Sequence, residues 1–167
     1  MLFRSKGERL NGNMTAQGLV SNGYSIGDLD FGVTGTLAAH QSDLSLVGGV
    51  LELNLGSKGA WDGKQLTQRF TDGMIKPEGF GRWQLDQTPR LQLSAAGGQV
   101  SAHCWKQNTS SICIKDSEWS EQSLTSAILI DDFALATLEP WFAEGNSIDG
   151  SVDASLTLER DSAGMQA

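Results

Sequence analysis

One serine in this chain has the surroundings of a hydrolase nucleophile. Gly23-Tyr24-Ser25-Ile26-Gly27 has the G-x-S-x-G pattern, which in esterases places the serine on a sharp turn between a strand and a helix. Here the pattern is followed by Asp28-Leu29-Asp30-Phe31, whose alternating polar and apolar residues indicate a strand. We therefore expect Ser25 to lie in a β-turn, and we predict no catalytic residue in the chain.

The motifs that could bind a metal ion or a phosphate are also incomplete. Asp28-Leu29-Asp30 resembles the start of a calcium loop, but the later acidic ligands are missing. His103 stands beside Cys104, yet 2 histidines and 2 cysteines in the whole chain do not assemble convincingly into a zinc site. The glycines of segment 59–64 lack the spacing of a phosphate-binding loop. The sequence therefore predicts no metal, no cofactor and no enzymatic activity.

The two cysteines instead have the spacing of a stapled hairpin. Strand-like segments flank Asn108-Thr109, and a two-residue turn there sets Cys104 directly opposite Cys113. Opposed residues of an antiparallel pair lie close enough for a disulfide, which would stabilise the hairpin by roughly 2–3 kcal/mol. Such a bond indicates an oxidising compartment, either periplasmic or extracellular. Two reduced thiols that happen to be neighbours remain the alternative.

The elements that position these residues are strands, because apolar residues alternate along most of the chain. Leu51, Leu53 and Leu55 share one parity, with polar Glu52 and Asn54 between them, and a period of two places each set on one face of a strand. The sequence predicts an all-β chain, an elongated, antiparallel-rich sheet with one apolar and one polar face. The residues expected to line the apolar face are Leu29, Phe31, Val33, Leu44, Leu46, Leu51, Leu53, Leu55, Leu91, Leu93, Trp105, Ile112, Ile114, Ile128, Ile130, Val152, Leu156 and Leu158.

The chain reads as a single β-rich segment over 1–167, and four parts are expected within it. These are a turn-rich lead-in over 1–23 with one weak strand, strands over 24–131, a short amphipathic helix over 132–144 and a strand over 147–160. The helix expectation rests on the cap candidates Asp131-Asp132 and on the apolar spacing of Phe133 to Leu138. We expect this helix to lie against the apolar face or to plug it. Turns are expected at 56–59 and over 71–79.

Composition narrows the class of partner. The 167 residues carry a formal net charge of −8, which disfavours nucleic acid and anionic lipid headgroups because both require clustered positive charge. The sequence has no apolar run long enough for a transmembrane helix and no signal-peptide pattern at its start. A strand-like segment runs to Arg160, close to the last residue, so we expect an internal fragment of a longer protein.

The second half of the chain resembles the TamB family, the translocation and assembly module subunit of Gram-negative envelopes. The resemblance is carried by Ala102-His103-Cys104-Trp105, by Ile112-Cys113-Ile114, by Leu135 to Trp141 and by the segment from Ile148 to Ala154. It implies a taco-like hydrophobic groove, as in AsmA-like and bridge-like lipid-transfer proteins. It also implies a periplasmic location, in a parent anchored in the inner membrane by an N-terminal helix absent from this chain.

The function implied by the resemblance is a groove segment that shields lipid acyl chains. Such a segment supports phospholipid transport between the inner and outer membranes and outer-membrane biogenesis. The implied partners are phospholipid acyl chains, a TamA-type outer-membrane barrel and outer-membrane protein clients. The alternatives are a periplasmic scaffold or chaperone acting without lipid, a secreted β-solenoid such as an adhesin passenger, and a closed β-sandwich whose apolar faces form a core.

Overall fold

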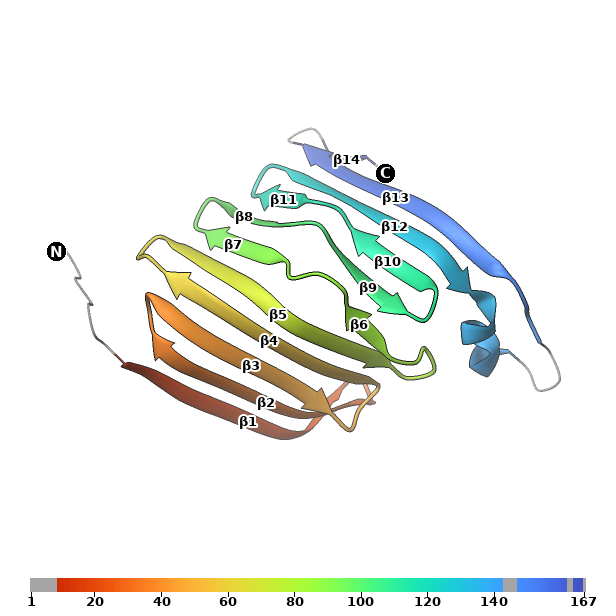
Figure 1. The fold of residues 1–167 in the computed structure, drawn as a ribbon, viewed down its shortest axis with the longest axis horizontal. Helices are drawn as coiled ribbons and strands as arrows, with labels where there is room; N and C mark the ends of the chain where they lie inside the picture. The colour runs from red at the N-terminus through yellow and green to blue at the C-terminus, as the bar shows by residue number, and fades with distance from the viewer. Residues whose placement is uncertain (1–8, 143–146, 162–163, 167) are drawn as a thin grey trace.

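The protein is one antiparallel β-sheet, shown as a computed structural model in Figure 1. The structure describes residues 9–142, 147–161 and 164–166. A 3₁₀ helix, η1 (Leu135–Trp141), follows β12. The strands are β1 (Arg9–Ser21), β2 (Tyr24–Thr36), β3 (Ala39–Val47), β4 (Leu51–Trp61), β5 (Gln65–Pro77), β6 (Trp83–Leu85), β7 (Arg90–Ser94), β8 (Gly97–Val100), β9 (His103–Gln107), β10 (Ser110–Ile114), β11 (Ser117–Ser120), β12 (Leu124–Ala134), β13 (Ser151–Asp161) and β14 (Gly164–Gln166).

The strands follow one another as a meander that divides and rejoins. Strands β1 to β5 lie side by side in chain order. Strand β5 then pairs with β7 near its start and with β6 near its end. One arm continues through β8 and β11 and the other through β9 and β10, and both arms reach β12. Every pairing is antiparallel, so the all-β, antiparallel prediction is confirmed.

Side chains supply hydrogen bonds where the two arms separate. Pro89, which has no backbone N–H, directly precedes β7. The Arg90 amide donates to the Ser101 hydroxyl at 2.9 Å, and the Ala102 amide donates to the Asp116 carboxylate at 2.8 Å. These short polar side chains replace ladder partners and satisfy the backbone at the break.

The segment expected to be a turn-rich lead-in is a full strand, so that prediction was wrong within residues 9–21. β1 is 13 residues long and pairs with β2 from Arg9↔Thr36 to Ser21↔Tyr24, with irregularities near Leu19. Its glycines and asparagines disfavour strands in isolation, but cross-strand pairing overrides a weak local preference. Residues 1–8 of the expected lead-in lie outside the described residues.

Two further expected turns are strand interiors. Gly56 and Gly59 lie within β4, where they give room to the side chains of Asp72 and Gln68 on the neighbouring strand. Strand β5 continues through the expected 71–79 turn as far as Pro77, with a bulge near Thr71 and Asp72. Glycine was a poor guide here because it marked close approach between strands rather than chain reversal.

The prediction of an amphipathic helix over 132–144 was also wrong, both in the extent of the helix and in its type. β12 continues to Ala134, with Asp132 at a bulge and at φ 48°. The Ser110 hydroxyl donates to the Asp132 carbonyl at 2.7 Å and accepts from the Ala134 amide at 3.2 Å, which holds this segment to β10. The 3₁₀ helix that follows has no side-chain cap. Residues 143 and 144 lie outside the described ranges, and the strand expected over 147–160 is β13, which begins only at Ser151.

The sheet is a single layer, not two packed sheets. Among the described residues, the buried hydrophobic residues are Leu46 and Trp83, which are 9% and 3% exposed. No side chain in the described ranges is completely enclosed. The accessible surface is 11368 Å², whereas a compact monomer of this mass exposes about 8,000 Å². The closed β-sandwich alternative is therefore not the fold of this chain.

Candidate functional site: the apolar face

The pairing register places the predicted apolar residues on one face of the sheet. Directly paired residues point to the same side, and Phe31 pairs with Leu44, which in turn pairs with Leu55. One residue pair further along, Leu46 pairs with Leu53, which pairs with Ile75. We call this side of the sheet the apolar face.

The apolar face continues across the divided part of the sheet. Leu85 pairs with Trp105, Trp105 with Ile112, and Ile112 with Ile130. Ile130 pairs with Ala154, which alternates with Leu156 on β13. Through these registers the structure brings every predicted lining residue, from Leu29 on β2 to Leu158 on β13, to the same side.

The apolar face has residues that the sequence analysis did not single out. Met14 on β1 pairs with Phe31, and Trp83 on β6 pairs with Ile75. Phe133 pairs with Val152 beyond the β12 bulge. Met14 was missed because the β1 segment was interpreted as turn-rich, with only one weak strand. The alternation of Trp83 and Leu85 was the available signal for the short strand β6.

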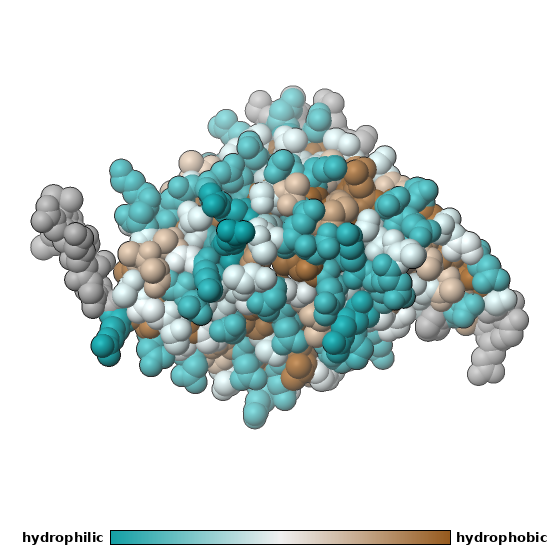
Figure 2. Space-filling model, in the orientation of Figure 1, coloured by the Kyte–Doolittle hydropathy of each residue, from teal (hydrophilic) through white to brown (hydrophobic). Residues whose placement is uncertain are grey.

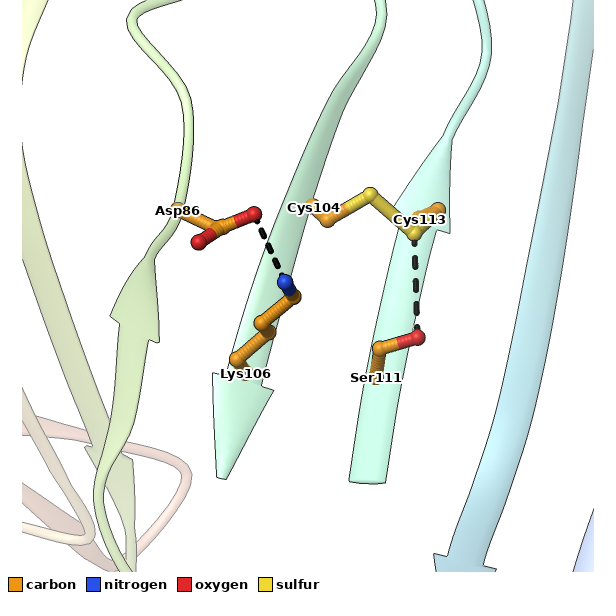
Figure 3. A network of polar contacts seen from close by, with 5 residues as sticks. All are labelled: Asp86, Cys104, Lys106, Ser111 and Cys113. Carbon is orange, nitrogen blue, oxygen red and sulfur yellow. Dashed lines mark hydrogen bonds and ion pairs between the residues drawn. A yellow bond between two sulfur atoms is a disulfide. The ribbon is translucent and has the colours of Figure 1, made fainter. Parts of the chain in front are cut away.

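The opposite side of the sheet is polar and carries the disulfide. Cys104 and Cys113 are joined directly across β9 and β10, with their Cα atoms 4.0 Å apart. Next to them the ammonium of Lys106 pairs with the Asp86 carboxylate at 2.9 Å (Figure 3), and the Ser111 hydroxyl lies 3.8 Å from the sulfur of Cys113. Figure 2 shows a largely hydrophilic surface on which apolar residues form only separate patches.

The register of this hairpin is the one that the sequence predicted. Gln107 faces Ser110, Trp105 faces Ile112, and His103 faces Ile114. The turn residue Asn108 has φ 52°, a left-handed conformation that asparagine tolerates well. The predicted disulfide is present, and the alternative of two free thiols is wrong.

An aromatic cluster spans the apolar face at the end of the sheet near η1. Trp83 on β6 stacks on Phe133 on β12 with ring centroids 6.0 Å apart, although β9 and β10 lie between the two strands. The Trp83 indole donates to the Phe80 carbonyl at 3.1 Å. The Phe80 ring meets Trp141 of η1 edge-on at 5.0 Å. The 3₁₀ helix is therefore held to this end of the face by aromatic contacts.

A small polar group interrupts the apolar face on β3, β4 and β5. His40, Ser42 and Ser57 are each less than a tenth exposed, and Gln68 lies beside them. The two serine hydroxyls are 2.7 Å apart, and the Gln68 amide donates to them at 3.0 and 3.2 Å. We call these four residues the polar notch.

Among the described residues, two carboxyl groups have a lowered pKa, and neither lies on the apolar face. Asp62 lies in the turn after β4, and Asp132 lies at the β12 bulge. Backbone amides of Gln65 and then Lys64 donate to Asp62 and lower the pKa of its carboxyl below the ordinary 3.8. Hydrogen bonds from the side chains of Thr109 and then Ser151 lower the pKa of Asp132. Neither shift creates a group that titrates near neutral pH, as general acid–base catalysis would need.

The residues considered for other chemistry are dispersed. Ser25 is the second residue of β2 rather than part of a turn, and its hydroxyl donates to the Gly48 carbonyl at 3.4 Å. His103 lies on the apolar face with Nδ1 2.9 Å from the Ser101 carbonyl. Within the described ranges, no group of three or more histidine, cysteine or acidic side chains is arranged to hold a metal ion.

Comparison with known proteins gives one result. The family model described as "TamB, N-terminal domain" matches residues 7–166, so the match covers both halves of the sheet. Neither the curated proteins nor the solved structures give a significant match. In the part of the chain that the structure describes, no helix has the length and apolar character needed to cross a bilayer.

Proposed function

The chain belongs to the TamB family, and from this premise we propose that its apolar face shelters lipid acyl chains. In this role the chain is a segment of a periplasmic groove that supports phospholipid transport between the inner and outer membranes and outer-membrane biogenesis. The observation that carries the proposal is an apolar face that extends from β1 to β13 and that, within the described residues, has no second sheet layer over it. A soluble domain ordinarily buries such a face in its core.

The energetics of lipid transfer favour such a surface. Exposing acyl chains to water costs about 0.8 kcal/mol per methylene, so a two-chain phospholipid faces a barrier of roughly 25 kcal/mol. The registers from Met14 on β1 to Leu156 on β13 provide hydrocarbon contact along the whole width of the sheet. A lipid that moves along this face exchanges one apolar neighbour for another and never meets that full barrier.

The exposure of apolar side chains on β1 and β13 also supports the proposal. Met14 is 52% exposed and Leu156 is 46% exposed, whereas Leu46 on the interior strand β3 is 9% exposed. Apolar side chains of this face are thus exposed on β1 and β13 and are available there for contact with acyl chains.

Site-specific photocrosslinking tests the proposal. A photoreactive residue at Leu53 on the apolar face is compared with one at Asn54, the next residue of β4, which points to the polar face. In Gram-negative cells, phospholipid adducts are expected at Leu53 and not at Asn54. Equal adducts at both positions, or none at Leu53, would contradict lipid binding on this face.

A second candidate is a scaffold that assists outer-membrane or autotransporter protein assembly with a TamA-type barrel. The observation that favours it is that, among the described residues, the 13-residue strand β1 pairs with β2 on one side and with no strand on the other. An unpaired edge accepts an extended client strand by β-augmentation. Adducts with client proteins at β1, without lipid adducts at Leu53, would favour the scaffold over the conduit.

A further inference from the structure

A cavity of about 640 Å³ lies at the end of the sheet where η1 meets the connection between β5 and β6 (Figure 1). We call it the end cavity. Cavities of this size with a mainly apolar lining are typical of sites for small organic molecules. Pro77 lines the end cavity and pairs with Leu51 on the apolar face, so the cavity adjoins that face. Its lining includes aromatic Tyr24, Phe80 and Trp141, apolar Val50 and Pro77, and acidic Glu78.

The end cavity opens directly to solvent. Tyr24 is 66% exposed and Trp141 is 67% exposed, although both are large aromatic residues. A ligand therefore reaches these rings without any rearrangement of the chain. Adjoining apolar groups on an exposed surface are a feature of binding sites. The two rings are thus accessible walls of the cavity rather than part of a core.

Hydrogen bonds hold the other walls of the end cavity in place. The Glu78 amide donates to the Val50 carbonyl at 2.9 Å, which joins the end of β5 to the start of β4. The Phe80 carbonyl accepts from the Trp83 indole at 3.1 Å and from the Gln107 amide at 3.0 Å. The cavity is therefore formed before a ligand arrives, which lowers the free-energy cost of binding.

The Glu78 carboxylate is the charged group of the end cavity. It is exposed, and among the described residues it takes part in no ion pair or side-chain hydrogen bond. Lys76, the nearest cation along the chain, is paired with Glu52 at 2.8 Å. The faces of aromatic rings carry negative potential and attract cations, as a carboxylate does. The lining of the cavity therefore fits an organic cation such as an alkylammonium group.

We propose that the end cavity binds the ammonium end of a zwitterionic phospholipid, whose acyl chains lie on the adjoining apolar face. The ammonium group lies against the aromatic rings and near Glu78, and the acyl chains pass Pro77 toward Leu51. The glycerol headgroup of phosphatidylglycerol has no cation, and its net negative charge is repelled by Glu78. The inference rests on the proposed lipid-binding function and adds headgroup selectivity to it.

The test compares two lipids that differ in the headgroup cation alone. Diheptanoyl phosphatidylcholine and diheptanoyl phosphatidylglycerol, each below its micelle concentration, are titrated into the 167-residue chain by calorimetry. The choline lipid is expected to bind about threefold to tenfold more tightly. The net charge of −8 on the whole chain also repels phosphatidylglycerol, so matched variants are needed to isolate the contribution of the cavity.

Two pairs of variants separate the cavity from the rest of the chain. Glu78→Gln and Glu121→Gln change the net charge equally, but Glu121 precedes β12, at the opposite end of that strand from η1. The preference should fall by about twofold to threefold in Glu78→Gln alone. Trp141→Leu keeps the charge and should weaken binding of the choline lipid by about twofold to fivefold. Trp61→Leu, at the far end of β4 from Val50, should not.

The outcomes distinguish this inference from the proposed function. Headgroup selection by the end cavity is overturned if the two lipids bind the wild-type chain equally, or if either Glu78→Gln or Trp141→Leu behaves like its control. Acyl-chain shelter stands in those cases. If neither lipid binds the wild-type chain, both proposals fail. Glu78 and Trp141 are exposed, so both variants are expected to fold, which far-ultraviolet circular dichroism checks.

Discussion

Replacing Trp83 should reveal how far a single-layer sheet depends on its aromatic cluster. The Trp83 side chain is 3% exposed, stacks on Phe133 at 6.0 Å and donates to the Phe80 carbonyl at 3.1 Å. Truncating a buried tryptophan costs about 3–5 kcal/mol, because apolar contact is lost and a cavity remains. One side of this cavity adjoins the open apolar face, so neighbouring side chains relax into it more easily than in a closed core. We therefore expect Trp83→Ala to destabilise the chain by about 3 kcal/mol.

The measurement is urea denaturation followed by far-ultraviolet circular dichroism, which does not depend on tryptophan emission. Trp141→Ala is the matched control, because that ring is 67% exposed, and a loss below about 1 kcal/mol is expected. A double-mutant cycle between Trp83 and Phe133 should give a coupling of about 0.5–1.5 kcal/mol. Similar losses in Trp83→Ala and Trp141→Ala, or a coupling near zero, would refute the bridging role of this aromatic pair.

The remaining predictions concern the hairpin and a turn. Replacing Cys104 and Cys113 with serine should cost about 2–3 kcal/mol in the same assay, and thiol labelling of the unreduced wild-type chain should find no free cysteine; an unchanged midpoint would contradict the staple. Because hydrogen bonds from Gln65 and then Lys64 lower the pKa of Asp62, its stabilising contribution is present above pH 3.8 and is lost as the pH falls through the folded-state pKa. Carboxyl NMR should place the Asp62 midpoint below 3.8, and Asp62→Ala should destabilise the chain at neutral pH but not at low pH, whereas a midpoint at or above 3.8 would remove this effect.

The all-β fold and the apolar face were predictable because they depend on a strong local signal. Alternation at Leu51, Leu53 and Leu55 fixes which side chains share a face, and a slip of one residue would move all of them to the polar face. The Cys104–Cys113 register was equally accessible, because a two-residue turn determines every pairing outward from it.

The predictions that were wrong concern segments whose conformation depends on the strands that pair with them. β1 forms because β2 pairs with it along its 13 residues, whereas its glycines and asparagines indicate only turns and one weak strand. The segment at Asp131 and Asp132 has helix-cap residues, but Ser110 on a neighbouring strand holds it extended. The polar notch was missed for a related reason, since His40 and Gln68 meet only through the register of three strands.

The location of the acyl chains is tested most directly by paramagnetic relaxation of methyl groups. A phospholipid with a nitroxide in its acyl chain is added to the chain labelled at leucine and isoleucine methyl groups. The methyl signals of Leu44, Leu53 and Ile112 should broaden more strongly than that of Leu129, which shares the polar face with Cys113. Equal broadening of Leu129, or none at the three apolar-face positions under saturating lipid, would contradict lipid shelter by the apolar face.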